Sequence, residues 1–300
     1  MLKAERIIRN DRQLKAITGV DKVEFGRVAE NFEILWEEFL NNRPRARLIG
    51  GGRKGVLGSI EDKVLFILFY IKAYPTFDVA SFIFGADRTR CCQWVIRLLP
   101  ILEKTLGRTT EFPKRKLRSV EEFLEAFPEV KDIFIDGTER RVRNSKKYYK
   151  QRKNYSGKKK MHTRKNLVAC DEQGKILLVS PTDGGRVHDL TCLKKWNICH
   201  NIPKQVAIWT DKGFAGLRTL CNNEVMAPHK KPRKSTLSKE HREENKIISG
   251  LRIVVEHSIG GMKRFNCLAQ VYRNRNGQDD TMTSIAAAIW NLHLQTRAAA

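Results

Sequence analysis

The apolar positions of the N-terminal part of the chain recur every three or four residues, which is the spacing of one helix face. Residues 1 to about 42 are therefore predicted to be helical. The clearest apolar face there consists of Phe32, Leu35, Trp36, Phe39 and Leu40. A basic, glycine-rich stretch from Arg43 to Gly58 follows and is typical of a linker.

A second helical block begins at Ser59, which forms a capping-box pattern with Asp62 ahead of an apolar run at 64–71. Pro75 is predicted to end this helix, and a short further helix fits residues 77–84.

The residues that follow have the outline of a helix-turn-helix. Gly85 supplies a turn after the short helix, and a basic helix fits residues 87–99. In such motifs the second helix lies in the major groove of DNA. The candidate contact residues are Arg88, Arg90, Gln93 and Arg97. An ordinary helical bundle with a polar outer face has the same pattern, so both interpretations stay open for this block alone.

From Lys131 onward the pattern changes to short apolar runs bounded by Gly, Asp or Pro, which predict strands. These strands are expected at 133–135, 166–170, 175–179 and 205–209. Helical spacing predicts further helices at 190–196, 238–262 and 281–296. Strands with interleaved and terminal helices predict an α/β domain built on one mixed sheet.

Four regions are predicted along the chain. They are a helical region and linker over 1–58, a helix-turn-helix domain over 59–107, a connector over 108–131 and the α/β domain over 132–297.

The charge of the chain narrows the choice of partners. Its 300 residues include 57 Lys and Arg against 33 acids, a formal net charge of +24. So large an excess favours binding to a polyanion, with DNA or RNA as the first candidate and an anionic membrane surface as the second. The longest apolar run, 64–71, is too short to span a bilayer, and the charged N-terminus lacks the apolar core of a signal peptide. A protein that works inside the cell is predicted, nucleoid-associated if the host is bacterial.

The seven cysteines include no C-x-x-C pair and form an odd set. Neither a disulfide framework nor a zinc knuckle is indicated, and the cysteines are predicted to be reduced thiols, several of them buried.

Three acidic residues are placed where chemistry is expected. Asp136 directly follows one predicted strand, and Asp211 directly follows another. The ends of strands in an open sheet converge on one crevice. Glu256 lies on a predicted helix, within about 40° of Arg252 and Lys263 around the helix axis.

Carboxylates gathered in this way are suited to Mg²⁺, and two such ions support phosphoryl transfer. For any single acid a turn residue or helix cap is the commoner role, and an Arg-Glu-Lys face is usually a solvated set of ion pairs.

Four motifs, in order along the chain, carry a resemblance to DDE transposases of the insertion-sequence-five group and the related PIF/Harbinger elements. The motifs are Ile135-Asp136-Gly137-Thr138-Glu139, Gly185-Arg186-Val187-His188-Asp189, Asp211-Lys212-Gly213-Phe214 and Arg252-x₃-Glu256-x₆-Lys263-Arg264-Phe265. The chain departs from the wider signature at Ser249, where the family often has tyrosine. The role of that tyrosine is therefore not transferred to this chain.

The resemblance implies a ribonuclease-H-like catalytic domain that hydrolyses DNA at transposon ends and then joins the freed 3′-hydroxyl to target DNA. It implies that Asp136, Asp211 and Glu256 are catalytic and hold two Mg²⁺ or Mn²⁺ ions. The residues expected to support the metal site or contact the DNA end are His188, Asp189, Arg252 and Lys263. For Asp189 a second interpretation, slightly favoured, is that it caps the helix beginning at Leu190.

A basic segment follows the first catalytic acid. Residues 140–165 contain 13 Lys or Arg, interleaved with Tyr148, Tyr149 and Tyr155. The segment fits a disordered basic loop or localisation signal, but tyrosines among cations favour an ordered surface that grips a DNA strand. The DNA contacts expected here are Lys146, Lys147, Tyr148, Lys158, Lys159 and Lys160, with a second patch at Lys230, Lys231, Arg233 and Lys234.

An active transposase is the leading interpretation. Its expected partners are the terminal inverted repeats, the target DNA and at least one further copy of the chain. Two alternatives are a transposase-derived DNA-binding regulator without catalysis and an RNA-processing nuclease of the same fold.

Overall fold

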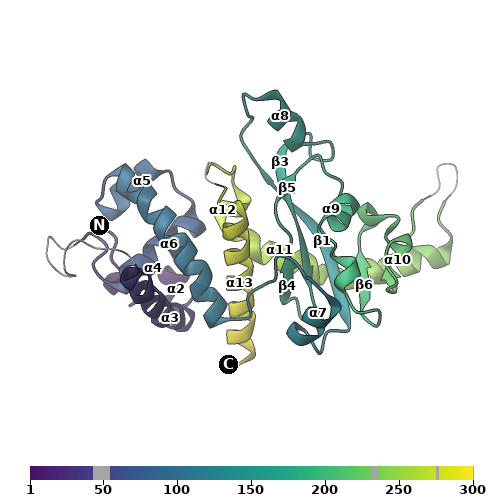
Figure 1. The fold of residues 1–300 in the computed structure, drawn as a ribbon, viewed down its shortest axis with the longest axis horizontal. Coiled ribbons are helices and arrows are strands. Elements are labelled where there is room, and N and C mark those ends of the chain that lie inside the picture. The colour runs from purple at the N-terminus through teal and green to yellow at the C-terminus, as the bar shows by residue number, and fades with distance from the viewer. Residues whose placement is uncertain (43–54, 232–235, 275–276, 300) are drawn as a thin grey trace. The chain divides into compact units, whose positions relative to one another are not determined.

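The computed structural model describes residues 1–42, 55–231, 236–274 and 277–299. Most of the predicted linker, 43–54, lies outside the described residues. The chain forms two compact units, each built from distant segments. The first combines Met1–Phe112, Lys263–Gln270 and Thr281–Ala300, and the second combines Pro113–Met262 and Val271–Asp280. The domain bounds expected from the sequence stay a prediction. Figure 1 labels the elements of both units.

The first unit is entirely helical in its described part. Its helices are α1 (Ala4–Ile7), α2 (Asp11–Thr18), α3 (Lys22–Asn41), α4 (Ile60–Ala73), α5 (Phe77–Phe84), α6 (Arg88–Thr109), α12 (Asn266–Ala269) and, from Thr281, α13 (Asp279–Ala298). The apolar run at 64–71 is buried along its whole length, so α4 forms the centre of this unit.

The start of α4 differs in one bond from the predicted capping box. The Ser59 hydroxyl accepts a hydrogen bond from the Asp62 amide, as predicted. The Asp62 carboxylate does not accept the reciprocal hydrogen bond from the Ser59 amide. It accepts one from the Ala4 amide at 3.1 Å and pairs with Lys3 at 2.7 Å, and so ties α1 to α4.

The helix-turn-helix outline is confirmed in its elements. Gly85 follows α5 with a φ of +62°, a left-handed conformation that suits glycine, and Asp87 caps α6. The second helix continues to Thr109, ten residues past its predicted end, with Pro100 inside it. A buried apolar stripe that includes Leu98, Leu102 and Leu106 extends along this part of α6, and its burial explains the extra length.

The second unit is built on a mixed sheet. Its strands are β1 (Asp132–Arg141), β2 (Tyr155–Ser156), β3 (Met161–Cys170), β4 (Ile176–Val179), β5 (Asp183–Gly184), β6 (Ala207–Thr210) and β7 (Val225–Met226). The strand order is β2-β3-β1-β6-β7, with β4 and β5 also paired to β3. Strand β1 is antiparallel to β3 and parallel to β6, and β6 is parallel to β7.

Helices accompany this sheet. They are α7 (Val120–Ala126), α8 (Tyr148–Asn154), α9 (Asp189–Lys195), α10 (Lys239–Leu251) and α11 (Ile253–Lys263), with short 3₁₀ turns η1 (Cys199–Asn201), η2 (Lys212–Phe214) and η3 (Leu217–Thr219). The sheet, α7, α9 and the 3₁₀ turns share one apolar core. The predicted class, α/β with a mixed sheet flanked by helices after an all-helical region, is confirmed.

Two elements of the second unit differ from their predictions. Strand β1 has ten residues rather than three, because pairing with β3 continues through its polar half to Arg141↔Thr163. Asp136 therefore lies inside the strand and not at its end. The single helix predicted over 238–262 is interrupted at Arg252, between α10 and α11.

Five of the seven cysteines are buried, as predicted. Burial raises the pKa of the Cys91 thiol to about 11 and of Cys170 to about 12.

In the described ranges, no helix has both the length and the apolar character that crossing a membrane requires.

Candidate active site

Parallel pairing brings the first two acids of the predicted triad together. The β1–β6 ladder ends at the pair Ile135↔Thr210, and the next residues on the two strands are Asp136 and Asp211. Beyond this pair β1 continues along β3, whereas β6 stops. The two carboxylates therefore lie at the point where the sheet opens.

Backbone amides fix one oxygen of each carboxylate. Asp136 Oδ1 accepts a hydrogen bond from the Gly137 amide at 2.7 Å. Asp211 Oδ1 accepts one from the Gly213 amide at 2.8 Å and so caps η2. A short bond to a neighbouring amide restricts the rotation of each side chain, which prearranges both acids.

The charge of Asp136 is disfavoured where it lies. Burial raises the pKa of this carboxyl, and the charge of Asp211 raises it further. The Gly137 amide, Arg252 and Lys158 act in the opposite direction without reversing the shift. A partly buried carboxylate with a second carboxylate beside it also attracts a divalent cation.

The third acid is placed by the junction of α10 and α11. The Arg252 side chain is 10% exposed, and its Nη2 lies 3.2 Å from Asp136 Oδ2. Further along α11, the buried Ser258 donates a hydrogen bond to the Gly174 carbonyl in the β3–β4 turn at 2.7 Å. These contacts fix α11 against the sheet. Glu256 lies between them, one turn after Arg252, and is exposed.

The ligand atoms of Asp136, Asp211 and Glu256 do not form one tight cluster. Among described residues, two groups of three metal-ligating side chains have ligand atoms within 4.8 Å of one another, and neither includes the three acids. A pair of Mg²⁺ ions about 3.5–4 Å apart needs its ligands spread more widely than one ion does. Hard carboxylate oxygens beside Arg252 remain a donor set that suits such ions.

Asp189 lies against both aspartate motifs. A Cβ at Gly137 would meet Asp189 Oδ1 at 3.0 Å, and a Cβ at Gly213 would meet Asp189 Oδ2 at 3.2 Å. The helix α9 begins at Asp189 itself, after His188, which makes no side-chain cap bond. The cap interpretation is therefore wrong, because the carboxylate points at the glycines and not at the amides of its own helix.

A buried lysine holds Asp189 in this place. Lys165 Nζ lies 2.7 Å from Asp189 Oδ1 and 3.4 Å from Glu139 Oε1, and donates to the Val187 carbonyl at 2.9 Å. Burial alone would lower the pKa of Lys165, but Asp189 and Glu139 outweigh it and raise the pKa. This role is not visible in the sequence, because Lys165 is one cation among 13 in a basic run.

The remaining member of the third-acid signature, Lys263, is the exposed last residue of α11 and the first residue of the segment grouped with the helical unit.

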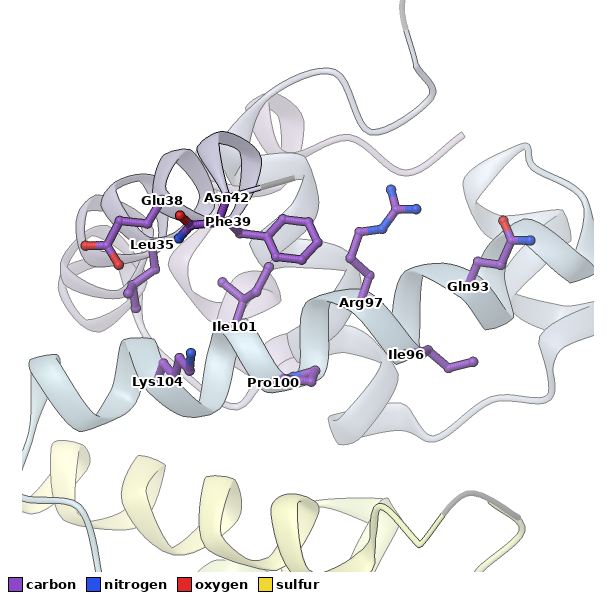
Figure 2. A pocket seen from close by; sticks show the side chains of 10 residues that line it. All are labelled: Leu35, Glu38, Phe39, Asn42, Gln93, Ile96, Arg97, Pro100, Ile101 and Lys104. Atoms are coloured by element: carbon purple, nitrogen blue, oxygen red, sulfur yellow. The ribbon is translucent and has the colours of Figure 1, made fainter. Parts of the chain in front are cut away.

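In the helical unit, the four residues of α6 that are predicted to contact DNA are all exposed: Arg88, Arg90, Gln93 and Arg97. Gln93 and Arg97 also line a groove of about 580 Å³ between α3 and α6. Figure 2 shows their side chains projecting from α6, with Phe39 and Glu38 on the facing α3. Arg88 Nε lies 3.7 Å from Asp78 Oδ1, and Arg90 Nε lies 3.6 Å from Asp87 Oδ2. Both ion pairs are exposed and therefore weak, so a DNA phosphate can replace the carboxylate in either pair.

The basic segment after β1 is ordered and largely exposed. It contains α8 and β2, so the disordered-loop interpretation is wrong in the structure. Tyr148 and Tyr149 are 74% and 61% exposed. The candidate contacts Lys146, Lys147, Lys158, Lys159 and Lys160 are exposed as well. The charge of Lys158 acts to lower the pKa of Asp136.

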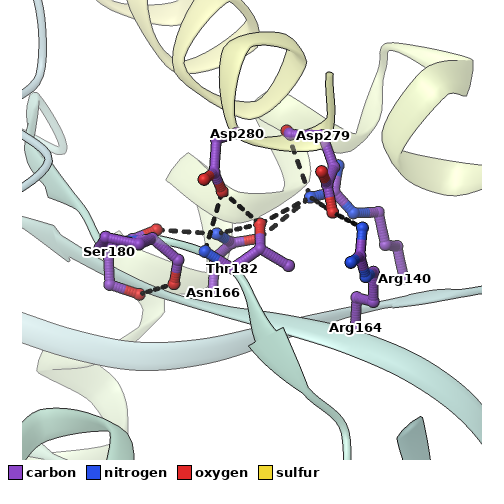
Figure 3. A network of polar contacts seen from close by, with 8 residues as sticks. Arg140, Arg164, Asn166, Ser180, Thr182, Asp279 and Asp280 are labelled. Carbon is purple, nitrogen blue, oxygen red and sulfur yellow. Dashed lines mark hydrogen bonds and ion pairs between the residues drawn. The ribbon is translucent and has the colours of Figure 1, made fainter. Parts of the chain in front are cut away.

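The first cation of this run has a structural role. Arg140 is 4% exposed, and its Nη2 donates to Asn166 Oδ1 at 3.3 Å, to Thr182 Oγ1 at 3.2 Å and to the Asp279 carbonyl at 3.2 Å. Figure 3 shows this network, in which Arg164 pairs with the Asp279 carboxylate. Arg140 and Lys165 therefore do not belong to the exposed basic surface.

The second basic patch is described only in part. Lys230 and Lys231 are exposed, whereas Arg233 and Lys234 lie outside the described residues.

Comparisons with known proteins agree with this arrangement. Residues 135–293 match the family described as DDE superfamily endonuclease, and residues 55–108 match the helix-turn-helix of DDE superfamily endonuclease. A probable transposase for insertion sequence element IS702 from Microchaete diplosiphon is 28% identical over 287 residues, 96% of each chain. No solved structure matches significantly.

Enzymes of the DDE superfamily use divalent metal ions, and the helix-turn-helix match implies DNA binding. The family match covers more than half of the chain, includes all three acids of the predicted triad and follows a matching helix-turn-helix in the expected order. The chain therefore belongs to the DDE superfamily endonucleases.

Proposed function

We propose that this protein is a transposase that cuts DNA at the inverted repeats of an insertion sequence and joins the freed 3′-hydroxyl to target DNA. The observation that carries the proposal is the placement of Asp136 and Asp211 directly after the last β1–β6 pair. Arg252 pairs with Asp136, and the exposed Glu256 follows one turn later on α11.

Asp136, Asp211 and Glu256 are the residues that would hold Mg²⁺ or Mn²⁺, two ions per site. When bound, such ions activate the attacking hydroxyl and stabilise the departing oxygen. The chain's own contribution is positional. Amides of Gly137 and Gly213 fix one oxygen of each aspartate, and Asp189 packs against both glycines, one in β1 and one in η2.

The surroundings of the acids suit a DNA strand. The exposed lysines 158–160 lie on the surface whose charge reaches Asp136, and the tyrosines of α8 offer flat rings beside them. Cations meet phosphates while rings stack on bases. In the helical unit α6 would read the terminal repeat in the major groove. Because both transposon ends must be held together, we also propose a homodimer or larger oligomer on DNA.

The test is a nicking assay on a supercoiled plasmid that carries the element's own ends. With Mg²⁺ or Mn²⁺ the wild-type protein is expected to nick at the ends. Asp136→Ala, Asp211→Ala and Glu256→Ala are each expected to abolish nicking while leaving DNA binding within about twofold. The exposed Glu125 on α7 provides the matched control, since Glu125→Ala removes a carboxylate of the same unit that belongs to none of the four motifs.

Three results would contradict the proposal. If the triad variants nick the plasmid at the wild-type rate, the three acids are not catalytic. An absence of nicking with every divalent metal would favour a DNA-binding regulator. Tighter binding to duplex RNA than to duplex DNA of the same sequence would favour an RNA-processing nuclease.

A further inference from the structure

A histidine–glutamate cluster lies on the second unit, apart from the three acids. It consists of His229, in the segment after β7, and His241 and Glu244 of α10. One ligand atom from each of the three side chains lies within 4.8 Å of the other two. We propose that these residues form a binding site for a divalent first-row transition metal, with Zn²⁺ as the representative ion.

The donor set favours such an ion over Mg²⁺. Imidazole nitrogens suit Zn²⁺, Ni²⁺ and Cu²⁺, whereas Mg²⁺ takes oxygen ligands and keeps most of its waters. Two histidines and one glutamate are a known ligand combination for Zn²⁺ that leaves a fourth position for water. The site would therefore differ in its metal from the carboxylates of Asp136, Asp211 and Glu256.

The distances are close to those that coordination needs. His229 Nε2 lies 2.6 Å from Glu244 Oε2. The His229 and His241 rings stack with centroids 4.0 Å apart and planes 15° apart, so the exposed His241 ring has to turn before both imidazoles face one ion. A tetrahedral ion about 2.0–2.1 Å from each ligand separates neighbouring ligand atoms by about 3.3 Å. The nitrogen and the carboxylate oxygen need to move apart by less than about 1 Å, and the exposed side chains of His241 and Glu244 have room to turn.

The backbone that carries these side chains is already fixed. The His229 amide donates to Asn245 Oδ1 at 2.6 Å, and Asn245 Nδ2 donates to the His229 carbonyl at 3.2 Å. His241 and Glu244 are three residues apart on α10, so they lie on neighbouring positions of one helix face. Two separate segments thus present three ligands without a change in the fold. A bound ion would clamp the segment after β7 to α10, the helix that leads to Arg252.

Isothermal titration calorimetry with ZnCl₂ tests the proposal on the full chain, in excess Mg²⁺ to occupy the carboxylate site. We expect His241→Ala and His229→Ala each to remove one equivalent of bound Zn²⁺, or to weaken its binding by at least about tenfold. Glu244→Gln is expected to weaken the same equivalent. The matched control is His200→Ala, because His200 is also an exposed histidine of this unit but lies outside the cluster.

A second readout separates metal binding from misfolding. In hydrogen exchange, Zn²⁺ is expected to protect amides of α10 in the wild-type protein and in His200→Ala, but not in His241→Ala. The proposal is overturned if Zn²⁺ binds wild type and His241→Ala with equal stoichiometry and affinity, or if no Zn²⁺ binds in excess Mg²⁺. Neither readout depends on DNA cleavage, so the result is independent of the proposed transposase activity.

Discussion

At the scale of single residues, the surroundings of Asp136 oppose its ionised form. Burial raises its pKa above the ordinary value of 3.8, and the charge of Asp211 adds to the effect. An acid whose pKa is higher in the folded than in the unfolded protein destabilises the folded state when it is ionised. This loss of stability is absent at pH values well below the unfolded-state pKa and complete at pH values above the folded-state pKa. The ionised carboxylate therefore lowers the stability of the folded protein at neutral pH.

Asp136→Asn is accordingly expected to raise the melting temperature in metal-free buffer at pH 7.5. The gain should shrink as the pH is lowered towards 3.8, because the wild-type carboxyl then protonates and loses its penalty. Thermal unfolding at a series of pH values measures this, with Glu125→Gln as an exposed control. A lower melting temperature for Asp136→Asn at pH 7.5 would mean that the ion pair with Arg252 outweighs burial.

Asp189 is expected to position the segments around Gly137 and Gly213 rather than to react. Asp189→Asn keeps the shape of the side chain but removes the charge that faces Lys165 at 2.7 Å. We expect nicking to fall about 10–100-fold, as for groups that orient metal ligands, with a higher Mg²⁺ requirement and unchanged DNA affinity. Nicking rates across a Mg²⁺ series measure the effect, and Glu125→Gln, at an exposed acid of the same unit, is the control. A variant that matches wild type at every Mg²⁺ concentration would rule out this role.

At the scale of elements, α8 is a surface helix with no buried residue. Its tyrosines are the candidates for stacking on DNA bases. Tyr148→Ala with Tyr149→Ala is expected to weaken binding to single-stranded DNA by about 1–3 kcal/mol per stacked base. Tyr148→Phe with Tyr149→Phe keeps both rings and is expected to bind as wild type. Fluorescence anisotropy compares the pairs, and equal losses in both would assign the contact to the hydroxyls instead.

The sequence predicted those elements whose signal is local. The apolar run at 64–71, the Gly85 turn and the runs that end before Asp136 and Asp211 all correspond to elements in the structure. The polar half of β1 was missed because its partner is β3, and a polar strand has no apolar pattern to reveal it.

The break at Arg252 was also missed. Arg252 contacts Asp136, 116 residues away in the chain, and no local pattern reveals such a contact. The sequence therefore identifies the three acids and names Asp189 as a possible support, whereas the ion pair of Asp189 with Lys165 is seen only in the structure.

At the scale of the whole molecule, the two ends of the chain build one helical unit. Residues 281–300 are grouped with the first 112 residues, although a second unit lies between them in sequence. Several polar contacts join the ends, such as Thr110 Oγ1 to Gln295 Oε1 at 2.8 Å and Asn291 Nδ2 to the Glu111 carbonyl at 3.0 Å. The stability of the helix-turn-helix region should therefore depend on side chains of the last helix.

The contact between His293 and Glu24 is the most buried of these, and it carries the last prediction. His293 Nδ1 lies 3.0 Å from Glu24 Oε1, and the Glu24 side chain is fully buried. Its other oxygen accepts from the Asp21 amide at the start of α3, so His293→Ala leaves one oxygen of a buried carboxylate without a hydrogen-bond donor. The expected cost is about 1–3 kcal/mol in the free energy of unfolding of the helical unit.

Urea unfolding, together with hydrogen exchange of α3, measures this cost, with His200→Ala as the control. Glu24→Gln combined with His293→Ala completes a double-mutant cycle, and a direct contact predicts that the two losses are less than additive. Strictly additive losses, or a loss of protection confined to residues near position 293, would show that the C-terminal helix stabilises this unit through apolar packing alone.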